Sequence, residues 1–134
     1  MRFSKITLAI GCFVLFSFLF FSPATSYSET IEIDVAPNVL NIQSQGTVVT
    51  VHTDISYWLV DVSSVYLNGI LISSWKADDR GNFVAKFSMD DVKLLDGLKI
   101  GDYNELTLLG LTKDGEPFVG EQEIKVIDVM PQGR

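Results

Sequence analysis

The sequence predicts an all-β domain of two packed sheets, preceded by a helical export signal. The first observation is that apolar and polar residues alternate along most of residues 31–126, as they do in strands with one buried face. The second is that turn residues separate these alternating segments at intervals of about ten residues. The third is that, within this range, only residues 89–97 carry apolar side chains at a convincing helical spacing.

The N-terminus has the three parts of a secretory signal. Arg2 and Lys5 precede an apolar run over residues 6–21, and a polar stretch with small residues follows it. Ala24 and Ser26 occupy the two positions at which a cleavage site requires small residues, so we expect residues 1–26 to be removed. The alternative is an uncleaved membrane anchor, but a spanning helix needs about 20 apolar residues and this run is shorter.

Cleavage would leave residues 27–134 as one domain of about 108 residues, which is large enough to bury a single core. Cys12 is the only cysteine and lies inside the signal, so disulfides and thiolate metal sites are excluded from the domain. The apolar run continues beyond Cys12, which argues against a lipid-modified cysteine. Removing the two cations Arg2 and Lys5 changes the net charge from −7 to −9, which disfavours nucleic acid and anionic lipid as partners.

The first strands of the domain are predicted from alternation and composition. Residues 31–35 alternate isoleucine and valine with acidic residues and should form the opening strand. Pro37 interrupts it, and residues 39–42 resume it as an edge strand that changes sheets. Residues 47–53 are β-branched at nearly every position, which is a strong strand signal.

A hairpin follows in the middle of the chain. Residues 60–67 form a strand whose apolar phase slips at Ser63-Ser64, so we expect a β-bulge there. Asn68-Gly69 tolerates positive φ at both positions and predicts a two-residue hairpin turn. Residues 70–75 are then the return strand.

The helix is predicted from a change of period. A polar loop over residues 76–82 leads into a strand over residues 83–87. Ser88 has the form of a helix N-cap, with Asp91 three residues on to reciprocate. Residues 89–97 place apolar side chains on one side of a short helix and end at a glycine.

Two long alternating segments, residues 105–110 and 118–126, close the domain around the turn Lys113-Asp114-Gly115. About seven short strands at this spacing predict an immunoglobulin-like sandwich of two sheets. The cysteine pair of true immunoglobulin domains is absent from residues 27–134.

Several short motifs occur in an order that resembles one protein family. They are P-N-V-L-N at residues 37–41, D-V-S-S-V-Y-L-N-G at 61–69, L-T-L at 106–108, and D-G-E-P-F-V-G followed by I-K-V within 114–126. Over residues 37–128 the chain is similar to an immunoglobulin-like module of exported prokaryotic proteins. The resemblance implies a sandwich with an accessory role, often appended to other extracellular domains, and it implies no enzymatic activity.

The same resemblance raises the question of calcium. In that family the loop before the strand at residues 83–87 is often aspartate-rich and of calcium-binding type. Here the alternate positions before the loop glycine are Lys76, Asp78 and Arg80, so cations that repel a dication replace two of three carboxylates. We therefore expect no bound calcium, and nothing in the sequence indicates a cofactor.

Two arrangements imitate catalytic groups. His52 is the only histidine and would have to act alone as a base, so it is better interpreted as a surface residue of a strand. Asp90 and Asp91 form a carboxylate pair, but their place in the first turn of a helix explains them. We therefore expect a protein without enzymatic activity.

Antiparallel strands would bring three loops to one end of the sandwich, where recognition sites are common and aromatic residues are favoured. The candidate binding residues of this loop-end patch are Tyr57, Trp58, Trp75, Asp78, Asp79, Arg80 and Asp114. The competing and simpler interpretation is that Trp58 and Leu59 cover the core while Trp75 packs beneath a loop.

The leading hypothesis is a noncatalytic accessory module, exported to the periplasm or the extracellular space, that serves protein–protein interaction, adhesion or cell-surface assembly. Its partner would be another exported or cell-surface protein, with no nucleic acid and no stable membrane insertion after signal cleavage. The alternative is a protein that binds a small ligand or a carbohydrate, with Trp58 and Trp75 as stacking platforms.

Overall fold

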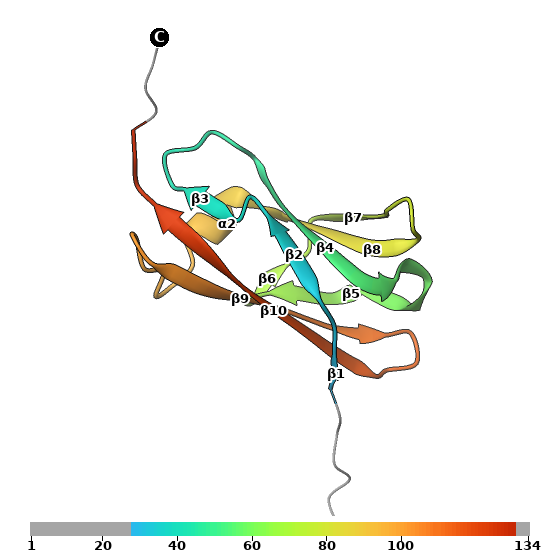
Figure 1. The fold of residues 1–134 in the computed structure, drawn as a ribbon. Helices are drawn as coiled ribbons and strands as arrows, with labels where there is room; N and C mark the ends of the chain where they lie inside the picture. Colours follow the sequence, from blue (N-terminus) through green and yellow to red (C-terminus); the bar gives the residue numbers. More distant parts are fainter. Residues whose placement is uncertain (1–27, 131–134) are drawn as a thin grey trace, which may run out of the picture.

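The computed structural model describes residues 28–130 and shows two β-sheets packed face to face (Figure 1). The all-β sandwich predicted from the alternation is therefore confirmed. The predicted signal at residues 1–26 and the tail at residues 131–134 lie outside the described residues.

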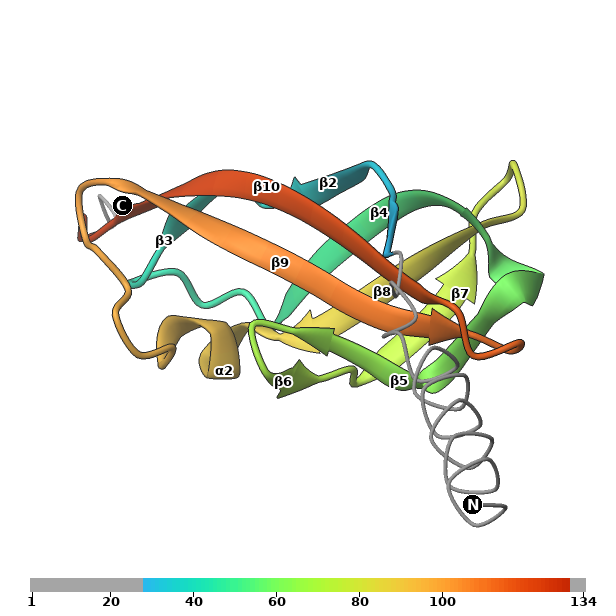
Figure 2. The ribbon, with the colours of Figure 1, turned by 90° about the horizontal axis from the view of Figure 1, so that it is seen from below.

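The larger sheet has the strand order β1-β10-β9-β5-β6, and β3 also pairs with β10. Its two longest strands, β9 and β10, form a hairpin that runs along the length of the sandwich (Figure 2). Its strands are β1 (Glu29–Thr30), β3 (Val39–Asn41), β5 (Val60–Leu67), β6 (Ile70–Leu71), β9 (Tyr103–Thr112) and β10 (Pro117–Ile127).

The smaller sheet has the strand order β2-β4-β8-β7 and covers the other side of the core. All three of its strand pairings are antiparallel. Its strands are β2 (Ile33–Ala36), β4 (Val48–Ser56), β7 (Ser74–Ala77) and β8 (Asn82–Ser88).

The N-terminal edge of the domain belongs to both sheets, as the interruption at Pro37 predicts. β2 pairs with β4 in the smaller sheet. After the cis peptide bond between Ala36 and Pro37, β3 pairs in parallel with β10 in the larger sheet. The change of sheets is confirmed, and it breaks the single N-terminal edge into three short strands.

The core lies between the sheets and consists of side chains that alternate inward along the strands. Phe83 and Phe87 from the smaller sheet and Phe118 from the larger sheet are fully buried. The intervening residues face solvent, as Asp34 on β2 and His52 on β4 show. Burial of these apolar side chains supplies the main stabilising contribution of a domain without disulfides.

Two local predictions in the middle of the chain are confirmed. The pairing of β5 with β9 shifts register between Asp61 and Tyr66, which places the bulge at the predicted phase slip. Asn68 and Gly69 have φ angles of 47° and 84°, the left-handed values that a two-residue hairpin of this kind requires. The turn therefore joins β5 to β6 as predicted.

The return strand over residues 70–75 is not one strand but two, and this part of the prediction is wrong. Ile70 and Leu71 stay paired with β5, and the buried Ile72 then carries the chain across the core. Ser73 donates its backbone N–H to the carbonyl of Lys86 (2.9 Å), so the chain joins β8 as β7. The predicted loop over residues 76–82 shrinks accordingly, because Lys76 and Ala77 belong to β7 and Asn82 to β8.

The helix is also shorter than the predicted range of residues 89–97. It is α2 (Met89–Lys93), and the Ser88 Oγ accepts from the Asp91 backbone N–H at 3.4 Å as the N-cap. Beyond Lys93 the backbone bonds tighten, because the Leu94 N–H donates to the Asp91 carbonyl and the Leu95 N–H to the Val92 carbonyl, each three residues earlier. The segment therefore continues as turns.

Among residues 28–130, no helix has the length and apolar character needed to cross a membrane.

Candidate functional site

Three loops meet at one end of the sandwich (Figures 1 and 2), which we call the loop end and define as residues 57–59, 78–81 and 113–116. The first is the 3-10 turn η1 (Tyr57–Leu59) between β4 and β5. The Tyr57 backbone N–H donates to the Gly81 carbonyl (2.9 Å), and the Lys113 N–H donates to the Leu59 carbonyl (2.8 Å). These backbone bonds tie η1 to both neighbouring loops.

Trp58 is the most exposed aromatic side chain of the described residues, at 73%. Its ring stands edge-on to the Tyr57 ring at 5.3 Å, and the Lys113 Nζ lies 5.8 Å from the Trp58 centroid. Tyr57 is half-buried and its ring lies 6.4 Å from that of the buried Phe83. Tyr57 therefore anchors the turn to the core while Trp58 projects from it.

The interpretation that Trp58 and Leu59 cover the core is wrong. Leu59 is 50% exposed, and none of the three side chains of η1 is fully buried. The core is closed at this end by the flanking residues Ile55 and Val60, which are 5% and 2% exposed. Because Ile55 and Val60 already close the core at this end, the central side chain of η1, that of Trp58, lies in solvent.

Trp75 is 43% exposed but lies apart from Trp58. It belongs to the edge strand β7 and pairs with Ala85, so two further residue pairs, Lys76 with Val84 and Ala77 with Phe83, separate it from the turn at residues 78–81. Ala85 faces the core, and residues paired across a ladder share a face, so Trp75 lies at the margin of the core. Within residues 28–130, the ring contacts of Trp58 are with Tyr57 and Lys113 and not with Trp75.

The turn between β7 and β8 uses its first aspartate for its own structure. The Asp78 Oδ1 accepts from the backbone N–H groups of Arg80 (2.8 Å) and Asn82 (2.9 Å). The hydrogen bond from the Asn82 backbone is the largest cause of the lowered pKa of Asp78, and the bond from the Arg80 backbone and the Arg80 charge also lower it. The carboxylate therefore acts as the closing group of the turn.

The other charged residues of the patch lie on its rim. Asp79, Arg80 and Asp114 are exposed, the first two in the β7–β8 turn and the third in the β9–β10 hairpin. In the described part of the chain, no three acidic, histidine or cysteine side chains gather in a way that could hold a metal ion.

The groups that imitate catalytic residues take the places that their local sequence predicts. His52 is exposed on the outer face of the smaller sheet, where it pairs with Asp34 of β2. Asp90 and Asp91 lie in the first turn of α2, and Lys93 lies in the last. Charges so arranged complement the helix dipole.

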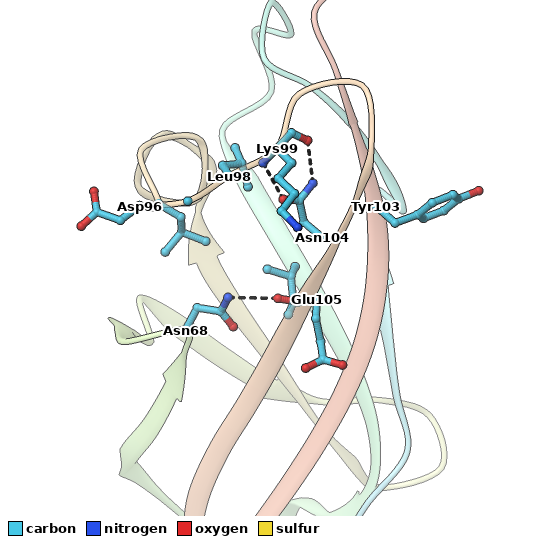
Figure 3. A pocket seen from close by; sticks show the side chains of 10 residues that line it. Asn68, Asp96, Leu98, Lys99, Tyr103, Asn104 and Glu105 are labelled. Atoms are coloured by element: carbon cyan, nitrogen blue, oxygen red, sulfur yellow. Dashed lines mark hydrogen bonds between the residues drawn. The ribbon is translucent and has the colours of Figure 1, made fainter.

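A pocket of about 200 Å³ lies at the opposite end of the sandwich, beside the Asn68 turn (Figure 3). The Asn68 Nδ2 donates to the Glu105 carbonyl (3.1 Å), and its Oδ1 accepts from the Thr107 backbone N–H (2.6 Å). The Asn104 side chain bonds both backbone groups of Lys99 in the same way. These polar groups are already paired, and the volume is below the range of about 300–1,000 Å³ of ordinary ligand pockets.

The sequence therefore predicted the loop end, whereas it did not predict the pocket beside Asn68. The pocket could not be predicted from the sequence, because the hydrogen-bond partners of the Asn68 side chain lie 37 and 39 residues away along the chain. No family model, curated protein or solved structure matches this chain.

Proposed function

We propose that this chain is a noncatalytic exported accessory module of immunoglobulin-like type that binds a partner protein through its loop end. The strand order supports the fold type. If β2, β4, β5, β7, β8, β9 and β10 are lettered A to G in chain order, one sheet reads A-B-E-D and the other contains C-F-G. That division is the one known for seven-stranded immunoglobulin domains.

The observation that carries the binding proposal is the exposure of Trp58 on a turn held by its neighbours. Tryptophan is the residue most enriched at interface hot spots, and its burial against a partner removes a large apolar area from water. The two backbone bonds from η1 to the adjacent loops fix the turn before binding. A site that is already ordered loses less conformational entropy on association.

The rim of the loop end suits a protein partner. Asp79, Arg80 and Asp114 add exposed charge of both signs to the loop end, which also carries the exposed apolar Trp58 and Leu59. An apolar centre with a charged rim is the usual arrangement of a protein–protein contact.

The alternative, a carbohydrate or small-ligand site, is favoured by one observation, which is that Trp58 and Trp75 are both substantially exposed. Against it, the Lys113 ammonium occupies one face of Trp58, and the two tryptophans lie on separate elements.

The test is affinity capture from the native exported fraction with the processed chain, expected to begin at Tyr27, as bait. Trp58→Ala should weaken binding of the captured partner by about 30-fold, which corresponds to the roughly 2 kcal/mol of a hot-spot residue. Trp75→Ala is the matched control and should change binding less than threefold.

Equal capture by wild type and Trp58→Ala would refute the loop-end site. Binding to a glycan array that both tryptophan variants abolish would instead support the carbohydrate alternative.

A further inference from the structure

The Asn68 side chain takes the place of a strand beside β9. Residues 103–107 of β9 extend past the end of β5, which pairs with β9 only up to the residue before Asn68. Thr107 donates its backbone N–H to the Asn68 Oδ1 (2.6 Å), and its carbonyl accepts from the Asn68 N–H (3.0 Å). The Asn68 Nδ2 donates to the Glu105 carbonyl (3.1 Å), as Figure 3 shows. Both polar atoms of the carboxamide therefore hold the β5–β6 hairpin against β9.

The side chain takes this role because of the conformation of the turn. Asn68 has a left-handed φ of 47°, which turns its main chain out of the strand and into the two-residue turn. The side-chain carbonyl then accepts the Thr107 N–H in place of a backbone carbonyl of a continuing strand. The turn and its attachment to β9 thus depend on the same carboxamide.

Asn68 also begins the only Asn-Gly pair of the 134-residue chain. Asparagine followed by glycine is the pair most open to deamidation, because glycine has no Cβ to obstruct the backbone nitrogen that attacks the side chain. Asn68 and Gly69 are both exposed, so water reaches them. The reactants that deamidation needs are therefore present at this turn.

We propose that Asn68 is a deamidation site of this protein and that the contacts of its side chain with β9 set the rate. The Gly69 backbone nitrogen attacks the Asn68 Cγ, the new N–C bond forms, and the Cγ–Nδ2 bond breaks. The proton of the Gly69 N–H leaves with the Nδ2 group as ammonia, and a cyclic succinimide remains. Water then adds to either ring carbonyl and gives aspartate or isoaspartate, so the reaction consumes one water and needs no oxidant.

The contacts with β9 oppose the first step. Ring closure brings the Asn68 Cγ onto the following backbone nitrogen, whereas both polar atoms of the carboxamide are bonded to β9 in the folded chain. Both bonds must break before the ring can close, and their breaking is a local opening of the hairpin end. Two hydrogen bonds of ordinary strength reduce the population of the open form roughly 30-fold. The folded chain is therefore modified slowly, without unfolding of the whole domain.

Modification loosens the same end of the larger sheet. Isoaspartate adds a methylene group to the main chain, which a two-residue turn cannot accommodate without losing its register. Aspartate lacks the Nδ2 donor and places an oxygen against the Glu105 carbonyl, so repulsion replaces a hydrogen bond. β6 pairs with β5 only through Ile70 and Leu71, so it depends on the turn. The pocket that Asn68 lines therefore opens when the residue is modified.

The first test follows the mass of the peptide that contains residue 68. The processed chain is incubated at neutral pH, once folded and once unfolded in urea, and is then analysed by peptide mapping. We expect the folded chain to lose the Asn68 amide roughly 30-fold more slowly than the unfolded chain. Hydrogen exchange of the Thr107 N–H measures the opening of the same contact. Its protection factor should match the slowing of deamidation and lie well below the protection of the amides in β4.

The second test uses the reaction product. Asn68→Asp should lower the melting temperature by about 5 °C, because it loses the bond to the Glu105 carbonyl. Asn38→Asp is the matched control, since it makes the same change of charge at another exposed position, and it should shift the melting temperature by less than about 2 °C.

Three results would overturn the proposal. The first is a folded chain that deamidates at Asn68 as fast as the unfolded chain, or not at all. The second is a Thr107 N–H that exchanges only when the whole domain unfolds. The third is an Asn68→Asp variant that melts at the temperature of the Asn38→Asp control.

Discussion

Gly110 lies directly opposite Phe118 across β9 and β10, and the phenylalanine ring occupies the space where a side chain would stand. A Cβ added at Gly110 would lie 2.4 Å from the ring Cζ and 2.9 Å from Cε2. Carbon atoms in contact are ordinarily about 3.5–4.0 Å apart, so the ring would have to retreat by about 1 Å. Phe118 has no exposed area, so its ring can retreat only by displacing other core residues.

We therefore expect Gly110→Ala to lower the free energy of unfolding by about 1.3 kcal/mol. Overpacking of this kind costs about 1–3 kcal/mol, and the lower entropy of the unfolded alanine chain offsets about 0.4–1 kcal/mol of it. In urea, with a slope of about 2 kcal/mol per molar, the midpoint should fall by about 0.7 M. Tryptophan fluorescence and circular dichroism should report the same transition.

Two further variants isolate the cause. Gly46→Ala is the control, because its Cβ would meet the flexible end of Met89 at 3.0 Å, and we expect a change below about 0.5 kcal/mol. Phe118→Leu should cost less in the Gly110→Ala background than in wild type, because the smaller side chain removes the clash. A Gly110→Ala midpoint equal to that of wild type, or strict additivity of the two substitutions, would show that the Phe118 ring does not exclude a side chain at Gly110.

Two pH-dependent predictions follow from the carboxylates. Folding lowers the pKa of Asp78 below its ordinary 3.8, chiefly through the Asn82 backbone bond, so its contribution to stability is present above that value and is lost as the pH falls through the lower folded-state pKa. Thermal melts at acidic pH should therefore vary less with pH for Asp78→Asn than for wild type, and parallel curves would contradict the role of its charge. Folding raises the pKa of Glu105 above 4.5, chiefly through its bond with Glu121, so the stabilising effect of the protonated form is lost as the pH rises through the raised value. Glu105→Gln should then raise the melting temperature of the domain at neutral pH, and a lower melting temperature would show that the ionised carboxylate is stabilising.

The features that could be predicted from the sequence are those decided by neighbouring residues. The slip of the valine phase at Ser63-Ser64 indicates the bulge in β5, because a one-residue shift moves every later side chain to the other face. Asn68-Gly69 indicates its turn because both residues accept positive φ. The three loops of the loop end follow from the alternation of strand direction, although no sequence feature tells whether Trp58 is buried.

The features that could not be predicted depend on partners distant in the chain. The crossing of Ile72 between sheets is decided by the bond of Ser73 to Lys86, and the exposure of Trp58 by how Ile55 and Val60 fill the core. The exposed apolar stripe that Val119, Leu109, Tyr66 and Leu71 form on the outer face of the larger sheet depends on the register of four strands. Leu109 carries a weak signal in the sequence, since it stands on the same strand phase as Glu105.

The pairing of β1 and β3 with β10 also has a consequence for the order in which the domain can assemble. Glu29 pairs with Phe118 and Val39 with Lys125, so the earliest strands of the described chain have their ladder partners on the last one. Contacts of such long sequence separation form slowly, because a large loop must close first. A nascent chain that stops before Pro117 can form the smaller sheet but leaves β1, β3 and one edge of β9 unpaired. The larger sheet is therefore complete only after β10 has been synthesised. Until then the unpaired edge of β9 can pair with other chains, so it is the segment most prone to aggregate.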